Sequence, residues 1–186
     1  MSLSAVLLCG GESHRMHRDK ATIEWRHQPL WERQMQTLRE LQPEAIFLSA
    51  RSDPDWRPSD VTLVLDVPDS RGPRAGILAV LAACVTDHLV VLAIDLPFIT
   101  SSFLRSMLQR VRGGVGLVPK IGEEFEPVAA IYPRGSIDAF KRAGSSLQPL
   151  VRELVDDGLL DVLEVAASDR QLFRNINEPA DLLQYA

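Results

Sequence analysis

Cysteine is scarce in this sequence, and nothing in it suggests a disulfide framework. Only two cysteines, Cys9 and Cys84, occur in 186 residues, and both lie within apolar runs. A chain of this length buries roughly 70% of its unfolded surface, so it needs no cross-links to fold. We therefore expect two buried thiols in a protein that stays in a reducing, cytoplasmic compartment.

Long hydrophobic runs and a strong positive charge are absent as well. No segment approaches the ~20 apolar residues of a membrane-spanning helix. The N-terminal apolar run, from Ala5 to Cys9, is shorter than the core of a signal peptide. The net charge of -5 makes a broad surface for nucleic acid or membranes unexpected. The expectation is a cytoplasmic protein that binds neither nucleic acid nor membranes.

Short apolar runs alternate with amphipathic segments along most of the chain. Four runs of successive Val, Ile and Leu residues are typical of strands buried on both faces of a parallel sheet. They lie at residues 4–9, 44–50, 61–66 and 88–95. Helical spacing is found between them, at 29–41, 75–83 and 102–111, and residues 100–102 form an N-capping cluster. This alternation predicts an α/β fold with three layers and a doubly wound, mostly parallel sheet of the Rossmann-like type.

The alternation loosens after Gly113, but no linker or repeat divides the chain. We expect a strand pair, then a helix, a strand and a short terminal helix. These lie at residues 115–118 and 128–132, 146–155, 160–165 and 180–183. The prediction is a single domain.

Candidate site residues follow the first predicted strand, because ligands of open α/β sheets bind beyond the carboxyl ends of the strands. Gly10 and Gly11 let the backbone approach a phosphate closely, and Arg15 and Lys20 add positive charge beside them. Lysine is rare in this chain, since only three of the 20 Lys and Arg residues are lysines, so a lysine at position 20 points to a specific role for that side chain. Taken alone, these residues fit a tight turn with solvated charges equally well.

The third and fourth predicted strands are followed by acidic residues. After Asp66, Gly72 and Gly76 suit a close backbone approach at the start of a helix rich in small residues. Asp95 follows the fourth strand, and Pro97 stiffens the chain beyond it. A carboxylate at such a strand end is well placed to hold a divalent cation such as Mg²⁺, although the segment alone also fits a strand-ending turn.

Taken together, these segments resemble the MobA-type nucleotidyltransferases, which attach GMP to molybdopterin. The loop after the first strand reads GGESHRMHRDKA, similar to the family's GGxSxRMGxDKA. The chain also contains GPRAGI, AIDLPF and FRNINEPADL, which are similar to the family's GPLAGI, DxPF and FxNINTPEDL. Residues 126–128, Glu-Pro-Val, stand where the family has a proline-led strand on the substrate side. The resemblance implies a nucleotidyltransferase fold, with residues 1–112 on the nucleotide side and 113–186 on the acceptor side.

The resemblance also implies a reaction and its residues. GMP would pass from GTP to molybdopterin with release of pyrophosphate, and molybdoenzyme maturation proteins are further expected partners. The implied catalytic residues are Arg15 at the β- and γ-phosphates, Lys20 at the α-phosphate and Asp95, which would bind Mg²⁺. The implied nucleotide-binding residues are Cys9, Gly10, Gly11, Arg15, Lys20, Asp66 near the base, Gly72 and Gly76. Asn175 and Asn177 are implied to face the acceptor from the end of a strand.

Three positions depart from the family pattern. His17 replaces the glycine after RM, and Arg74 replaces the leucine of GPLAG, as either a surface residue or an added phosphate contact. Ala50 stands where guanylyl members often carry an asparagine. Two other interpretations therefore stay open. One is a sister enzyme that uses CTP on molybdopterin, or an NTP on a phosphosugar or phosphoalcohol. The other is a nucleotide-binding regulatory module.

Neither the tryptophans nor the two neighbouring histidines are expected to form a site of their own. Trp25, Trp31 and Trp56 are isolated in the sequence, and we expect them to pack in the core or on the surface and not to stack on a base. His14 and His17 are three residues apart, but no carboxylate or thiolate completes a transition-metal set with them, so they are interpreted as loop histidines near phosphate.

Overall fold

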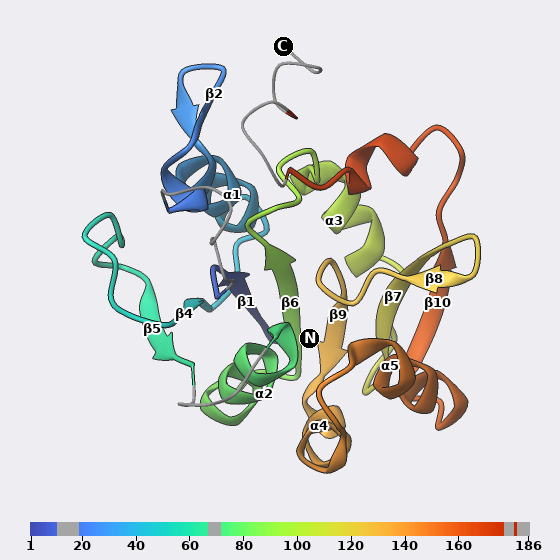
Figure 1. The fold of residues 1–186 in the computed structure, drawn as a ribbon. Coiled ribbons are helices and arrows are strands. Elements are labelled where there is room, and N and C mark those ends of the chain that lie inside the picture. The colour runs from blue at the N-terminus through green and yellow to red at the C-terminus, as the bar shows by residue number, and fades with distance from the viewer. Residues whose placement is uncertain (11–18, 67–71, 177–180, 182–186) are drawn as a thin grey trace.

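Parallel strands form the centre of the molecule, as the apolar runs predict (Figure 1). The computed structural model describes residues 1–10, 19–66, 72–176 and 181. Strand β1 (Leu3–Leu8) is buried along its whole length. It pairs in parallel with β4 (Ala45–Ala50) on one side and with β6 (His88–Ala93) on the other.

The sheet continues outward from these three strands. Its other strands are β5 (Thr62–Leu65), β7 (Gly116–Ile121), β8 (Glu124–Phe125), β9 (Ile131–Pro133) and β10 (Leu160–Glu164). Within the described ranges the order is β10, β7, β9, β6, β1, β4 and β5, and β8 pairs with β7 beside this path. Strand β9 is antiparallel to both of its neighbours, β6 and β7, so the predicted strand pair of the second half is confirmed.

Helices cover both faces of the sheet (Figure 1). They are α1 (Leu30–Arg39) and α3 (Ser101–Leu108) on one face, and α2 (Pro73–Ala83), α4 (Ile137–Arg142) and α5 (Leu147–Asp156) on the other. Alternate residues of β1 supply the two cores between these layers. Ala5 and Leu7 join the core under α1 and α3, whereas Val6 and Leu8 join the core under α2, α4 and α5. The three-layer, doubly wound prediction is confirmed.

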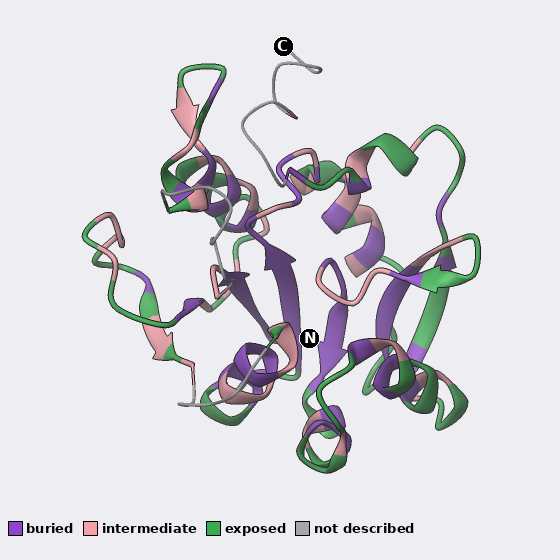
Figure 2. Ribbon diagram, viewed as in Figure 1, coloured by how far each residue is buried: buried purple, intermediate pink, exposed green. Residues whose placement is uncertain are grey.

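The edge strand β5 differs from the prediction. A strand buried on both faces was expected at residues 61–66, yet Thr62 is exposed and Leu65 is 54% exposed. Strand β5 pairs only with β4 among the described strands, so it lies at the edge of the sheet, where the flanking helices cover it less completely (Figure 2).

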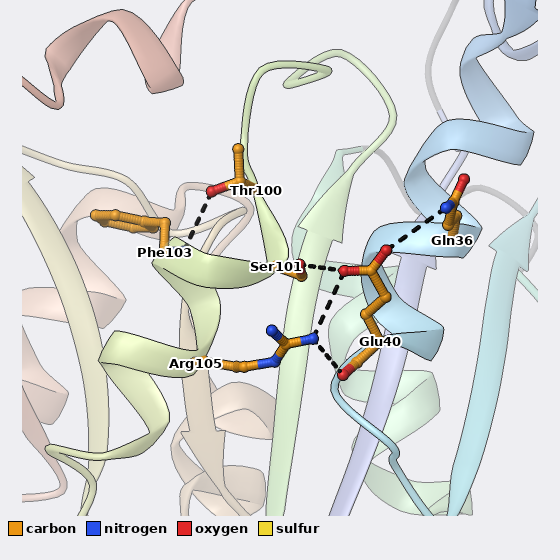
Figure 3. Close-up of polar contacts among 6 residues, drawn as sticks. All are labelled: Gln36, Glu40, Thr100, Ser101, Phe103 and Arg105. Carbon is orange, nitrogen blue, oxygen red and sulfur yellow. Dashed lines mark hydrogen bonds and ion pairs between the residues drawn. The ribbon is translucent and has the colours of Figure 1, made fainter.

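Helices α1 and α3 are joined by polar contacts at their ends (Figure 3). The hydroxyl of Thr100 caps α3 by accepting a hydrogen bond from the amide of Phe103 at 3.2 Å, which confirms the predicted capping cluster. At the end of α1, the backbone carbonyl of Glu40 accepts a hydrogen bond from Arg105 Nη2 at 2.9 Å, and the Glu40 carboxylate accepts one from Ser101. These contacts tie together the two helices that border the segment leading out of β6.

Several elements were not predicted. Helix α4 and strand β8 are two of them, and the hairpin of β2 (Glu24–Trp25) and β3 (Gln28–Pro29) is a third. The hairpin turn consists of Arg26 and His27, with φ of 52° and 63°. The predicted helix at 180–183 lies outside the described residues except for Asp181. None of the described helices is long and apolar enough to cross a membrane.

Candidate functional site

The carboxyl ends of β1, β4, β5 and β6 meet at one edge of the sheet. Backbone hydrogen bonds continue one step beyond the strands, from Cys9 N to Ser49 O at 2.8 Å and from Asp66 N to Ala50 O at 2.9 Å. On the other side of β1, the amide of Ile94, the residue before Asp95, donates to Leu8 O at 3.0 Å. These ladders bring the residues after the four strands together, as the fold predicts.

Asp66 is held next to Gly10 by a serine. Ser49 Oγ donates a hydrogen bond to Asp66 Oδ1 at 2.8 Å. A Cβ on Gly10 would collide with the Asp66 carboxylate, and a Cβ on Gly76 would collide with the Ser49 hydroxyl. Gly10 and Gly76 therefore leave room for the Ser49–Asp66 pair. The sequence indicates a close approach at both glycines, but it does not indicate these partners.

Gly72 has a different role at the start of α2. It is the N-cap residue and has a φ of 82°, in the left-handed region that favours glycine. A side chain there would have open space around it, so backbone conformation and not crowding accounts for the glycine.

Lys20 and Asp95 come together from distant parts of the sequence. Lys20 opens the short helix η1 (Lys20–Thr22), whose N-cap Asp19 accepts a hydrogen bond from the Ala21 amide at 3.0 Å. The ammonium nitrogen of Lys20 lies 4.0 Å from Asp95 Oδ2, and the two side chains are 16% and 33% exposed. Burial raises the pKa of the Asp95 carboxyl, and the positive charge of Lys20 opposes this rise.

The turn that carries Asp95 is fixed by α1. Gln34 is fully buried, and its side-chain amide donates to the carbonyl oxygens of Ala93 at 3.1 Å and Leu96 at 2.9 Å. The neighbouring Arg33 donates from Nε to Pro97 O at 2.9 Å. Sequence reasoning missed both residues. The available signal was a polar Gln34 on the apolar side of the helix, between Leu30 and Leu38.

Two stacked tryptophans hold Asp19, the residue before Lys20. Trp56 Nε1 donates to Asp19 Oδ2 at 2.9 Å, and its ring stacks on Trp31 with centroids 5.2 Å apart. Trp25 packs edge-on against Phe98 at 5.1 Å. The expectation that the tryptophans pack in the core or on the surface is confirmed, and all three contact another aromatic ring.

Cys9 lies among carboxylates at the end of β1. Burial raises the pKa of its thiol well above the usual value, and the negative charges of Asp19, Asp66 and Asp95 raise it further, in that order. The expectation of two buried thiols is confirmed for Cys84, but Cys9 is only half-buried, because it follows a strand that ends at the site. The negative charges of three carboxylates thus act on one thiol.

A comparison with known protein families matches residues 5–163 to the MobA-like NTP transferase domain. The chain belongs to this family.

Relatives of this chain are similar to it in sequence over nearly its full length. A probable molybdenum cofactor guanylyltransferase of Opitutus terrae is 33% identical over 187 residues, covering 97% of this chain and 93% of the relative. A molybdenum cofactor guanylyltransferase of Pseudomonas fluorescens is 35% identical, covering 97% and 92%. Among solved structures, molybdopterin-guanine dinucleotide biosynthesis protein A of Archaeoglobus fulgidus has a TM-score of 0.76 at 23% identity, covering 97% and 95%. A cytidylyltransferase of Thermus thermophilus that acts on 2-C-methyl-D-erythritol 4-phosphate has a TM-score of 0.66 at 15% identity, covering 96% and 95%. These two structures show the shared fold.

Not all residues expected from the MobA-like pattern can be placed. Gly11, Arg15, His17 and Asn177 lie outside the described residues. No group of three or more His, Cys, Asp or Glu residues in the described part of the chain is arranged to hold a metal ion. Asp95 is among the described residues, and the metal-binding role expected of it stays a prediction.

The structure corrects the expected surroundings of Asn175 and Arg74. Asn175 is exposed and follows the short helix η3 (Arg170–Phe173), not a strand, although the next amide, of Ile176, donates to Asp95 O at 2.9 Å. Arg74 is half-buried and not a solvated surface residue, and the added phosphate contact stays a prediction. Its Nη1 donates to Phe140 O at 2.6 Å and so joins α2 to α4.

Proposed function

We propose that this MobA-like nucleotidyltransferase transfers GMP from GTP to molybdopterin and releases pyrophosphate. The observation that carries the proposal is the approach of Lys20 to within 4.0 Å of Asp95. This pair lies where a triphosphate would enter, at the carboxyl ends of β1 and β6. The names of relatives that are 33% and 35% identical over nearly the whole chain support GMP and molybdopterin as the group transferred and its acceptor.

Asp66 is suited to read the base. Ser49 donates to one carboxylate oxygen, which fixes the direction of the side chain and leaves the second oxygen able to accept. Guanine offers two adjacent donors, N1–H and N2–H, and cytosine offers only its amino group on the corresponding edge. A carboxylate therefore favours guanine, and the alanine at position 50 removes the amide that would strengthen this preference.

Asp95 fits a Mg²⁺ ion. It is a carboxylate at a strand end, two-thirds buried, and its burial penalises the charged form, so a divalent cation would relieve the cost of that charge. Mg²⁺ is commonly held by one or two carboxylates together with substrate phosphates. When bound, such an ion would neutralise charge on the phosphates of the nucleotide.

The reaction that follows needs no protein nucleophile. A terminal phosphate oxygen of molybdopterin would attack the α-phosphorus of GTP in line, and the bond to the β-phosphate oxygen would break, with its electron pair leaving on pyrophosphate. The attacking phosphate is already ionised at neutral pH, so a general base is unnecessary. Lys20 would stabilise the negative charge that grows at the α-phosphate, and Arg15 would hold the β- and γ-phosphates.

A pyrophosphate-release assay tests the function. The protein is mixed with Mg²⁺, molybdopterin and one of GTP, CTP or ATP, and then with GTP and a phosphosugar in place of molybdopterin. Turnover that requires both GTP and molybdopterin is expected. Faster turnover with CTP would make the protein a cytidylyltransferase. Tight nucleotide binding in a calorimeter, without turnover on any acceptor, would indicate the regulatory module.

A further inference from the structure

Trp56 and Lys20 belong to separate segments, and the carboxylate of Asp19 connects them. Asp19 Oδ1 accepts a hydrogen bond from the Ala21 amide at 3.0 Å, and Asp19 Oδ2 accepts one from Trp56 Nε1 at 2.9 Å. Each carboxylate oxygen thus has a donor, one in η1 and one on the indole. Because Asp19 is the N-cap of η1, the direction of its side chain and the start of the helix, where Lys20 stands, are set together.

Helix α1 holds the indole ring of Trp56. This ring stacks on that of Trp31 in α1, with centroids 5.2 Å apart and an angle of 16° between the planes. Both tryptophans are half-buried and pack against the core under α1 and α3. A large ring that is stacked and half-buried has little freedom to tilt, so the N–H of Trp56 keeps its direction toward Asp19.

The segment between β4 and β5, which carries Trp56, is itself fixed. Arg57 forms a bidentate ion pair with Asp53, with N–O distances of 2.7 and 2.9 Å. Farther along the segment, both carboxylate oxygens of Asp60 accept hydrogen bonds from Arg39, the last residue of α1, at 2.8 and 2.9 Å. Helix α1 therefore holds this segment at two places, by stacked rings and by an ion pair.

The same helix also fixes the carboxylate that Lys20 faces. The side-chain amide of Gln34 binds the turn that carries Asp95, and Lys20 Nζ lies 4.0 Å from Asp95 Oδ2. Asp95 is thus fixed relative to α1 through Gln34. Lys20 is fixed relative to α1 through Asp19 and Trp56. Loss of either connection would alter the distance between the two charged groups.

The position of the Lys20 ammonium matters for the proposed reaction. Lys20 would stabilise the negative charge that grows at the α-phosphate, and such an interaction weakens as the charges move apart. We propose that Trp56 is a positioning residue for this reaction, because its N–H, through Asp19, sets where the Lys20 ammonium stands. This inference rests on the proposed function, which gives Lys20 its role in the transition state.

Trp56→Phe tests the inference, because it keeps an aromatic ring beside Trp31 and removes the N–H. Steady-state kinetics with GTP, Mg²⁺ and molybdopterin should show kcat lowered by about tenfold and the KM for GTP changed by less than about threefold. Asp19→Asn acts on the same hydrogen bond from its other end, since an amide offers one oxygen to two donors, and should also lower kcat. Melting curves without ligand verify that the variants are folded.

A double-mutant cycle with Lys20 separates positioning from a structural role. If Trp56 acts through Lys20, adding Trp56→Phe to Lys20→Ala should lower kcat no further, because the group that Trp56 positions is already absent. A purely structural role would lower kcat by the same factor in both backgrounds.

Trp31→Phe is the matched control. It makes the same replacement in the neighbouring ring, whose N–H does not bind Asp19, and it keeps an aromatic ring beside Trp56. Trp31→Phe should therefore lower kcat much less than Trp56→Phe does.

Two results would overturn the inference in distinguishable ways. If the wild type turns over GTP, but Trp56→Phe keeps its kcat or loses the same factor with and without Lys20, Trp56 does not position that lysine. If the wild type itself shows no turnover with GTP and molybdopterin, the proposed function fails, and the role of Trp56 fails with it.

Discussion

The carboxylate of Asp66 occupies the space that a side chain on Gly10 would need. The two residues belong to different strand ends, after β5 and after β1, and they meet because both strands flank β4. Asp66 is also held by a hydrogen bond from Ser49 to its other carboxylate oxygen. Gly10, at the start of the loop that resembles the family signature, therefore leaves room for the carboxylate of Asp66.

The first prediction follows from this contact. Gly10→Ala should push Asp66 off Ser49 and weaken base recognition, so kcat/KM for GTP should fall by about tenfold or more while that for CTP falls less. Steady-state kinetics with both nucleotides provide the measurement. The control is Gly113→Ala, because a Cβ at Gly113 would meet no atom within 4 Å. An unchanged GTP preference in Gly10→Ala would mean that Asp66 does not read the base.

The second prediction concerns Lys20. If it stabilises charge in the transition state, Lys20→Ala should lower kcat by about 100-fold or more and change the KM for GTP much less. Lys141→Ala is the matched control, because Lys141 makes only a surface pair with Asp138 among the contacts described, at 3.0 Å. A normal kcat in Lys20→Ala would remove this residue from the catalytic set.

The third prediction concerns the buried amide of Gln34. Gln34→Leu keeps about the size of the side chain but removes two buried hydrogen bonds, leaving the carbonyls of Ala93 and Leu96 only their backbone donors, which should lower the free energy of unfolding by about 1–3 kcal/mol. It should also raise the Mg²⁺ concentration needed for half-maximal rate, because the turn carrying Asp95 loses its fixed position. Gln36→Leu, on the exposed side of α1, should change neither quantity. A destabilised variant with an unaltered Mg²⁺ requirement would assign Gln34 to folding alone.

The sequence was sufficient to predict the centre of the fold. Strands such as β1 and β6 are continuously apolar because they are buried on both faces, and that pattern is visible without a structure. The position of Asp95 follows directly, since a residue after a buried parallel strand must emerge at the ligand edge. Peripheral elements were harder to predict from the sequence. The β2–β3 hairpin turns through Arg26 and His27, which lack the glycine or asparagine that usually identifies such a turn.

The partners of site residues were the least predictable part. The amide of Ala93, at the end of β6, donates to Val128 O only because β9 runs antiparallel beside β6, and a register between segments far apart in sequence is not encoded in either one alone. Arg74 reaches the carbonyl of Phe140 because two helices pack together on the same face. Both contacts depend on the assembled fold, whereas the motif residues Lys20 and Asp95 could be recognised by their sequence context.

The last prediction separates a metal ligand from a residue that merely ends a strand. Burial is the largest influence on the Asp95 carboxyl and raises its pKa above the usual value of 3.8, even with Lys20 nearby. A carboxyl group with a raised pKa in the folded state favours folding when it is protonated, and this contribution is lost as the pH rises through the raised pKa. At pH 7 the ionised Asp95 therefore lowers stability. Asp95→Asn removes this charge.

Without ligand, Asp95→Asn should be at least as stable as the wild type at pH 7, and its advantage should shrink as the pH falls through the raised pKa, where the wild-type carboxyl takes up its proton. Its Mg²⁺-dependent turnover should nevertheless be abolished, because the amide is a poor substitute for a carboxylate ligand. Urea unfolding at several pH values, combined with the pyrophosphate assay, measures both effects. Asp138→Asn, on the exposed start of α4, should leave turnover intact. If Asp95→Asn retained its activity with the same Mg²⁺ requirement, Asp95 would have no role beyond the turn after β6.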